Sequence, residues 1–183
     1  MLITQNNLSV REIRETDFES IVDYFLKADK DFLSGMGVDT CKLPKRKEWL
    51  KLLSDEYHQS TKNKKTFYVI WILSNEPVGH SNINKIIYGQ EAYMHLHMWD
   101  TGKRQRGMGG EFLKMSLPYY FDNFKLKKLY CEPYVLNSAP NRRLKKSGFD
   151  FIEQYETIPG WLNFHQSVNK WCMGLKKFQL LYG

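Results

Sequence analysis

Three strand-like segments in a row, followed by a cluster of glycines, constrain the fold of this chain more than any other feature of its sequence. Residues 67–73 are dense in aromatic and β-branched residues, which favour strands. Residues 78–87 and 91–99 follow after short turns, so the three segments are predicted to form an antiparallel meander. Glycines within residues 107–110 come next and lead into a helix. The pattern places a glycine-rich loop at the end of a central strand.

The rest of the chain alternates between predicted strands and helices. Apolar and polar residues alternate over residues 8–13, as in a half-buried strand. A capping box from Thr16 to Glu19 begins a helix that runs to residue 26, and a loop follows as far as Trp49. The other predicted elements are a helix at 49–57, a helix after the glycines that Pro118 should kink, a strand at 126–132, a helix at 138–146 ended by Gly148, and strands at 149–157 and 168–174.

The length and composition predict one globular domain. The 183 residues are 42% hydrophobic and 26% charged, and they contain no repeat, low-complexity tract or linker, so we expect a single domain over 1–183. No run approaches the twenty or so apolar residues of a membrane span, and the first residues lack the pattern of a secretory signal. The three cysteines, Cys41, Cys131 and Cys172, are too few and too widely spaced for a disulfide framework or a CxxC zinc site. We therefore expect a cytoplasmic protein without a membrane partner.

Positive charge is concentrated in one stretch. The chain has 27 Lys and Arg against 20 Asp and Glu, a formal net charge of +7. Residues 103–146 alone carry a balance of +8, and the remainder carries −1. Such asymmetry indicates a localised anionic partner, either a nucleic acid or a phosphorylated small molecule, with a solvated basic face as the alternative.

The glycine-rich loop, residues 104–110, is suited to a phosphate group. Glycines let consecutive backbone N–H groups turn toward one point, and the helix that follows adds the positive end of its dipole. The loop contains neither the GxGxxG dinucleotide fingerprint nor the Gly-Lys-Ser/Thr ending of a P-loop.

Here the chain resembles the GNAT superfamily of acyl-CoA-dependent N-acetyltransferases. The family's pyrophosphate loop has the pattern Gln/Arg-x-x-Gly-x-Gly/Ala, which is met by Arg104, Gly107 and Gly109. Its second motif is an asparagine that leads into a helix ending near Gly-Phe, which is met by Asn137, Leu144, Lys146, Gly148 and Phe149. The order of the predicted elements also matches, so the resemblance covers nearly the whole chain.

The resemblance implies a fold and a reaction. The fold would be a GNAT-like α/β (α+β) domain, with a central twisted mixed sheet of about seven strands and helices on both faces. Acetyl-CoA would be the co-substrate, and its acetyl group would pass to a primary amine of a small molecule or a protein. Ribosomal-protein, aminoglycoside and siderophore-type members are equally close, and a homodimer is one assembly found in such families.

The resemblance also implies where coenzyme A binds. In the family the pantetheine arm lies between the strands predicted here at 91–99 and 126–132, and it pairs with backbone around His97. The backbone amides of residues 106–110 would take the pyrophosphate. The cofactor-binding residues implied in this way are Met98, Trp99, Arg104, Gln105, Arg106, Gly107, Met108, Gly109, Gly110, Asn137 and Asn141.

The resemblance identifies the catalytic residues less completely than the cofactor-binding residues. The family chemistry needs a base for the amine, a backbone N–H for the oxyanion and an acid for the thiolate. Many members use a tyrosine four residues before the Gly of Gly-Phe as the acid, and Leu144 stands there in this chain. The candidates are Glu132 or His97 as the base and Tyr134 as the acid. Each also has a purely structural interpretation, as a strand-end carboxylate, a strand histidine and a loop tyrosine.

Other interpretations remain open. His95 and His97 lie on one side of a strand and could bind a metal with Cys131 or Glu132, but no third ligand stands at a suitable spacing, so no metal is expected. Trp161 and Phe164 lie in a loop that could line an acceptor pocket. The alternatives to an enzyme are a non-catalytic acyl-CoA-binding module and a basic nucleic-acid-binding protein. No recognition helix or aromatic-basic strand motif supports the second of these.

Overall fold

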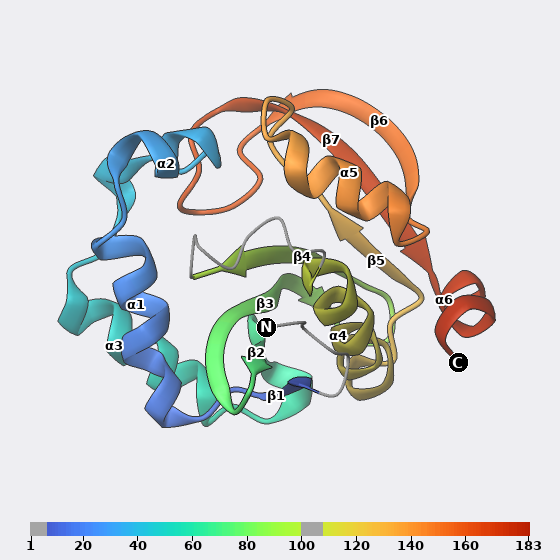
Figure 1. Ribbon diagram of the computed structural model, residues 1–183, viewed down its shortest axis with the longest axis horizontal. Coiled ribbons are helices and arrows are strands. Elements are labelled where there is room, and N and C mark those ends of the chain that lie inside the picture. The colour runs from blue at the N-terminus through green and yellow to red at the C-terminus, as the bar shows by residue number, and fades with distance from the viewer. Residues whose placement is uncertain (1–6, 100–107) are drawn as a thin grey trace.

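Seven strands form one sheet in the computed structural model, which describes residues 7–99 and 108–183. The strands are β1 (Leu8–Glu12), β2 (Phe67–Leu73), β3 (Glu76–Ile87), β4 (Glu91–Met98), β5 (Lys128–Cys131), β6 (Asp150–Thr157) and β7 (Gln166–Gly174). Their order across the sheet is β1-β2-β3-β4-β5-β7-β6 (Figure 1). The pairing of β4 with β5 is parallel, whereas the other neighbouring pairs are antiparallel. The predicted mixed sheet of about seven strands is confirmed.

Helices cover both faces of the sheet, as predicted. They are α1 (Phe18–Leu26), α2 (Lys30–Gly35), α3 (Arg46–Tyr57), α4 (Met108–Phe124), α5 (Ser138–Lys146) and α6 (Leu175–Tyr182). The helices α1 and α3 lie on one side of β2 and β3, and α4 lies on the other (Figure 1). No helix in the described ranges 7–99 and 108–183 is both long enough and apolar enough to cross a bilayer.

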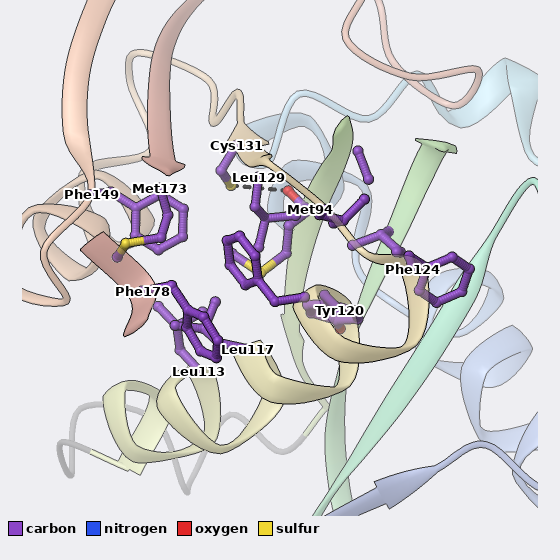
Figure 2. Packing of buried hydrophobic residues seen from close by; sticks show 14 of the residues in the cluster. Met94, Leu113, Leu117, Tyr120, Phe124, Leu129, Cys131, Phe149, Met173 and Phe178 are labelled. Atoms are coloured by element: carbon purple, nitrogen blue, oxygen red, sulfur yellow. Dashed lines mark hydrogen bonds between the residues drawn. The ribbon is translucent and has the colours of Figure 1, made fainter. Parts of the chain in front are cut away.

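The helix α4 forms the centre of the larger core. Its apolar side chains pack against β2 to β5 and against α6 (Figure 2). Tyr120 is fully buried in this core, and its hydroxyl lies 2.6 Å from the hydroxyl of Ser81 on β3. Pro118 lies inside α4, as the sequence predicted. This face therefore excludes water and satisfies the polar groups of the Tyr120–Ser81 pair.

Two short helices were missed by the sequence analysis. The helix α2 lies in the stretch interpreted as a loop, and α6 follows the last predicted strand directly. Six residues in α2 and eight in α6 are too few for a 3.6-residue periodicity to stand out. The helix α2 does have a local cap, because the Asp29 carboxylate accepts hydrogen bonds from the backbone N–H groups of residues 31 and 32.

The start of α1 also differs from the prediction. The Thr16-to-Glu19 capping box is wrong, because a short 3₁₀ turn, Glu15–Asp17, precedes α1. The buried carboxylate of Asp17 accepts the N–H of Arg14 at 2.7 Å and pairs with Arg11 at 2.6 Å. The start of α1 is therefore held by the contacts of Asp17 and not by the predicted box. At the end of α5, Gly148 has φ +78°, as its predicted role in ending that helix requires.

Candidate active site

The strands β4 and β5 separate after a short parallel pairing. Their register covers Glu91–Tyr93 on β4 and Lys128–Tyr130 on β5 (Figure 1). Immediately beyond it, the thiol of Cys131 donates to the carbonyl oxygen of Met94 at 3.0 Å. The five residues of β4 that follow Tyr93 extend past the end of this register. The sheet therefore opens at its centre.

The direction of the β4 backbone follows from strand geometry. The N–H of Trp99 donates to the carbonyl of Val78 on β3 at 2.9 Å. Backbone groups of alternate residues in a strand point the same way, so those of His97 also face β3, while those of Leu96 and Met98 face β5. The N–H of Trp99 already has its partner on β3, and the assignment of Trp99 to the cofactor stays a prediction. The backbone of Met98 faces β5, as its predicted pairing with the pantetheine arm requires. The backbone of Leu96 faces the same way, although the sequence analysis did not name this residue.

A cleft lies on the side of the sheet that carries α1 and α3. Its lining includes Met94, Leu96 and Cys131, which border the opening between β4 and β5. Aromatic rings and side-chain amides form much of the remainder, namely Phe25, Trp49, Tyr68, Trp161, Asn82, Asn84, Asn163 and Gln166. Trp161 thus lines the cleft, and its place in an acceptor pocket stays a prediction. Phe164 instead packs edge-on against Tyr134.

Three histidines meet in this cleft. His80 on β3 and His97 on β4 are opposite each other in register, with their rings stacked at 4.7 Å, and His95 lies two residues before His97. The indole N–H of Trp99 donates to Nδ1 of His80 at 2.8 Å, so the ring proton of neutral His80 is on Nε2. Burial lowers the pKa of His80 to about 3 and that of His95 to about 4. It also lowers the pKa of His97 well below 6.5, so the cluster is neutral at pH 7.

Glu132 follows β5 and is the one carboxylate among the described residues that line the cleft. Only 2% of its side chain is exposed, and the hydroxyl of Tyr155 on β6 donates a hydrogen bond to it. The Lys85 ammonium lies 3.9 Å from its second oxygen. Burial and then this hydrogen bond raise the pKa of Tyr155 above its ordinary value. Glu132 is thus a fixed carboxylate at the opening of the sheet, not the solvated strand end of the structural interpretation.

The segment after Glu132 is tied to α5 and β7. Asn141 donates to the carbonyl oxygens of Tyr134 and Asn137, at 3.2 and 2.9 Å. Its own amide oxygen accepts from Asn169 at 3.0 Å and from Trp171 at 2.9 Å. The amide of Asn141 thus binds the protein on both sides and fixes this segment, and its role in binding the cofactor stays a prediction. Tyr134 and Asn137 themselves line the cleft.

The start of α4 is partly described. Arg104, Gln105, Arg106 and Gly107, which the sequence assigned to the pyrophosphate, lie outside the described residues. A β-carbon added at Gly109 would meet no described atom within 4 Å, whereas one at Gly110 would lie 2.7 Å from a guanidinium nitrogen of Arg143. Gly109 therefore adjoins open space, and Gly110 makes room for a cation from α5. The side chain of Met108 is buried in the core.

No metal centre is formed by the described residues. Within residues 7–99 and 108–183, no three His, Cys, Asp or Glu side chains are placed to hold a metal ion. The thiol of Cys131 is turned to the carbonyl of Met94, as its bond there requires.

Sequence reasoning missed several residues of this region. His80, Asn82 and Asn84 recur at every second position of β3, so their common face was readable from strand alternation. No local signal pointed to Tyr155 or Arg143. Tyr155 on β6 reaches Glu132 across β7, which lies between β5 and β6 in the sheet, and no sequence pattern records that strand order.

Comparison with known proteins identifies the family. Residues 7–150 match the family model described as an acetyltransferase (GNAT) domain. The chain belongs to the GNAT family. It is accordingly an acyltransferase that uses acetyl-CoA as co-substrate. Leu144, at the position of the acid tyrosine in many members, is fully buried in the core and supplies no proton.

Solved structures share this GNAT fold at low sequence identity. The ribosomal L7/L12 alpha-N-protein acetyltransferase RimL, in complex with coenzyme A, has 16% identity and a TM-score of 0.76, over 96% of this chain and 98% of that one. Spermidine N-acetyltransferase from Vibrio cholerae, in complex with coenzyme A and spermine, has 14% identity and a TM-score of 0.78, over 96% and 99%. No curated protein sequence matches this chain.

Proposed function

We propose that this GNAT domain transfers the acetyl group of acetyl-CoA to a primary amine held in the cleft beside Glu132. The observation that carries this proposal is the opening between β4 and β5, which joins the cleft to the sheet centre next to a buried, oriented carboxylate. The start of α4, with open space at Gly109, lies on the same chain segment that follows β4.

The pantetheine arm of acetyl-CoA would lie along β4 in this opening. Leu96 and Met98 turn their backbone groups toward it, as an added strand requires. The N–H groups at the beginning of α4 would hold the pyrophosphate, together with the loop residues 104–107 assigned from the sequence. The guanidinium of Arg143 near Gly110 adds a positive charge at the same place.

The transfer itself needs a proton acceptor and a proton donor. Glu132 would take the proton of the amine as nitrogen attacks the thioester carbon, and Tyr155 would orient that carboxylate. A backbone N–H of β4 would stabilise the oxyanion. The carbon–sulfur bond then breaks, and Tyr134 would give a proton to the departing thiolate. His97 is the second candidate for the base, since its neutral ring lines the same cleft.

The base is tested by comparing two carboxylates. We expect Glu132→Gln to lower turnover by about 10²–10⁴-fold, the usual contribution of a general base, without changing the affinity for acetyl-CoA. Glu153→Gln changes an exposed carboxylate on β6 and should keep the wild-type rate. Thiol release measures turnover, and calorimetry measures acetyl-CoA binding. Wild-type turnover in Glu132→Gln would remove Glu132 from the role and leave His97→Ala as the next variant to assay.

The proposed site for acetyl-CoA is tested by replacing a glycine at the start of α4. Gly109→Trp should lower the affinity for acetyl-CoA at least tenfold by filling the space at the start of α4. Gly35→Trp is the matched control, because Gly35 also has no atom within 4 Å of an added β-carbon but lies at the end of α2. Equal affinity in both variants would contradict the assignment. Binding of acetyl-CoA without thiol release by any amine would favour the non-catalytic module.

A further inference from the structure

The cleft contains buried polar atoms that the protein leaves without a partner. Among the described residues, four buried side-chain atoms have no hydrogen-bond partner: Oδ1 of Asn84, Nε2 of His95, Nδ1 of His97 and Oε1 of Gln166. All four residues line this one cleft. A buried polar group without a partner costs about 1–3 kcal/mol, so their concentration at one place indicates a ligand that supplies the missing bonds.

The chemistry of these atoms defines what they would bind. The amide nitrogen of Gln166 donates to the carbonyl oxygens of Gly37 and Phe164, at 2.9 and 3.2 Å. This fixes the orientation of the amide, so Oε1 is a hydrogen-bond acceptor. Asn84 presents a second amide oxygen, and a neutral histidine ring offers one acceptor nitrogen. The two amide oxygens therefore call for a ligand with at least two N–H or O–H donors, and the ring nitrogens of His95 and His97 add a donor or an acceptor according to their tautomer.

The position of Gln166 is itself set by a contact between distant segments. Val38 and Asn163 form an isolated β-bridge, and the amide of Asn163 donates to the carbonyl of Gly37 at 2.8 Å. Gly37 has φ +83°, and a β-carbon there would overlap the Gln166 amide. The segment after α2 thus holds the loop before β7 over one end of the cleft.

The charges of the cleft point to a ligand with a single positive group. Glu132 is the carboxylate in the described lining, and it already has the Tyr155 hydroxyl and the Lys85 ammonium beside it. A second ammonium, from Lys170, lies 4.8 Å from the ring centre of Tyr130 on the same face of the sheet. An additional buried cation without its own carboxylate costs several kcal/mol. Among the described lining residues, Glu132 is the one carboxylate that can pair with such a cation, and the reacting amine takes this position.

We propose, on the basis of the acetyl transfer proposed above, that the acceptor is a monoamine whose neutral skeleton carries several N–H or O–H donors, and not a polyamine. Asn84, His95, His97 and Gln166 recognise the skeleton, and Glu132 receives the amine. A peptide N-terminus and an amino sugar both have this chemistry.

Competing amines test the proposal. Thiol release is measured with the tripeptide amide Ser-Ala-Ala-NH₂, glucosamine, n-butylamine and spermidine, each with saturating acetyl-CoA. We expect at least one of the first two to exceed n-butylamine in kcat/KM by tenfold or more, and spermidine not to exceed n-butylamine. Which of the two is preferred identifies the skeleton. A preference for spermidine, or equal values for all four amines, would overturn the proposal.

A variant separates recognition from chemistry. Asn84→Leu should lower the ratio of kcat/KM between the preferred amine and n-butylamine by about 3–10-fold, the contribution of one hydrogen bond. Asn123→Ala, which removes an exposed amide of α4 that binds Glu12, should leave that ratio unchanged. If no amine releases coenzyme A, the transfer chemistry has failed. Calorimetric binding of the tripeptide amide and spermidine in the presence of coenzyme A then still tests the cleft, and tighter binding of spermidine overturns this inference.

Discussion

The two faces of the central sheet differ in whether their buried polar groups have hydrogen-bond partners. On the α4 face, Leu113, Leu117 and Phe112 are fully buried, and the Tyr120 hydroxyl has its partner in Ser81. On the opposite face, the same strands present histidines and amides, and four buried polar atoms have no partner among the described residues. Both faces come from the same alternation along β3 and β4. The first face supplies stability, and the second retains polar groups at a cost in stability, as a binding site does.

The largest effect expected from this difference is on the pH dependence of stability. The pKa of His80 is about 3 and that of His95 about 4 in the folded protein, against 6.5 for an ordinary histidine. The unfolded chain therefore binds more protons below pH 6.5, so stability is full above that pH and is lost as the pH falls toward 4. We expect the free energy of unfolding to drop by about 3–5 kcal/mol between pH 7 and pH 4.5.

Urea unfolding at a series of pH values measures this loss. His95→Gln should lose less stability over the same pH interval, because it lacks one of the three histidines whose pKa burial lowers. Carboxylates titrate in both proteins, so the difference between the curves isolates the histidine. Two parallel curves would mean that His95 is not buried as described.

A smaller effect is expected from a cavity on the α4 face. Leu117 is fully buried, and Leu117→Ala should lower the free energy of unfolding by about 2–5 kcal/mol. Leu117 does not itself line the cleft, so kcat/KM per folded molecule should stay at the wild-type value. Denaturant unfolding and thiol release, measured on the same preparation, check the two statements. A loss of kcat/KM below the denaturation range would show that the faces are coupled.

The smallest effect is expected from an apolar replacement on the cleft face. The ring of His97 lies 5.5 Å from that of Tyr24 and 5.2 Å from that of Phe25, among aromatic neighbours. His97→Phe removes a buried nitrogen that has no described partner, so stability should stay within about 1 kcal/mol of the wild type or rise. Turnover should fall, in contrast to Leu117→Ala. A loss of more than 2 kcal/mol in urea unfolding would reveal a native partner for Nδ1.

The sequence-based prediction was accurate where a structure depends on residues close together in the chain, and it failed where contacts between separate elements decide. Strands and long helices were predicted because alternation and the 3.6-residue period are local patterns. The boundaries of α5 were found because Gly148 marks its end. The helices α2 and α6 were missed because they are short, and the capping box failed because a 3₁₀ turn precedes α1. Arg11 on β1 and Asp17 in that turn form an ion pair. That ion pair joins elements whose packing no local pattern records.

In the candidate site too, residues marked by local patterns were predicted, whereas contacts between distant segments were not. Glu132, His97 and Tyr134 were named from strand ends and the family resemblance, and all three line the cleft. Their partners were not predictable. His80 lies opposite His97 only because a register shift between Asn84 and Ile87 changes the pairing of β3 with β4. Asn141, named for the cofactor, binds Asn169 and Trp171 on β7, and no local pattern predicted these contacts.

The sequence by itself determined the alternation of elements, the glycine-rich loop and the family, because each depends on residues close together in the chain. The tertiary structure alone decided which side chains face one another across the cleft. The Tyr155–Glu132 contact spans 23 residues and the Gln166–Gly37 contact 129. Such contacts depend on strand order and on the folding of α2 over the sheet, and both are set by burial of apolar surface from the whole chain.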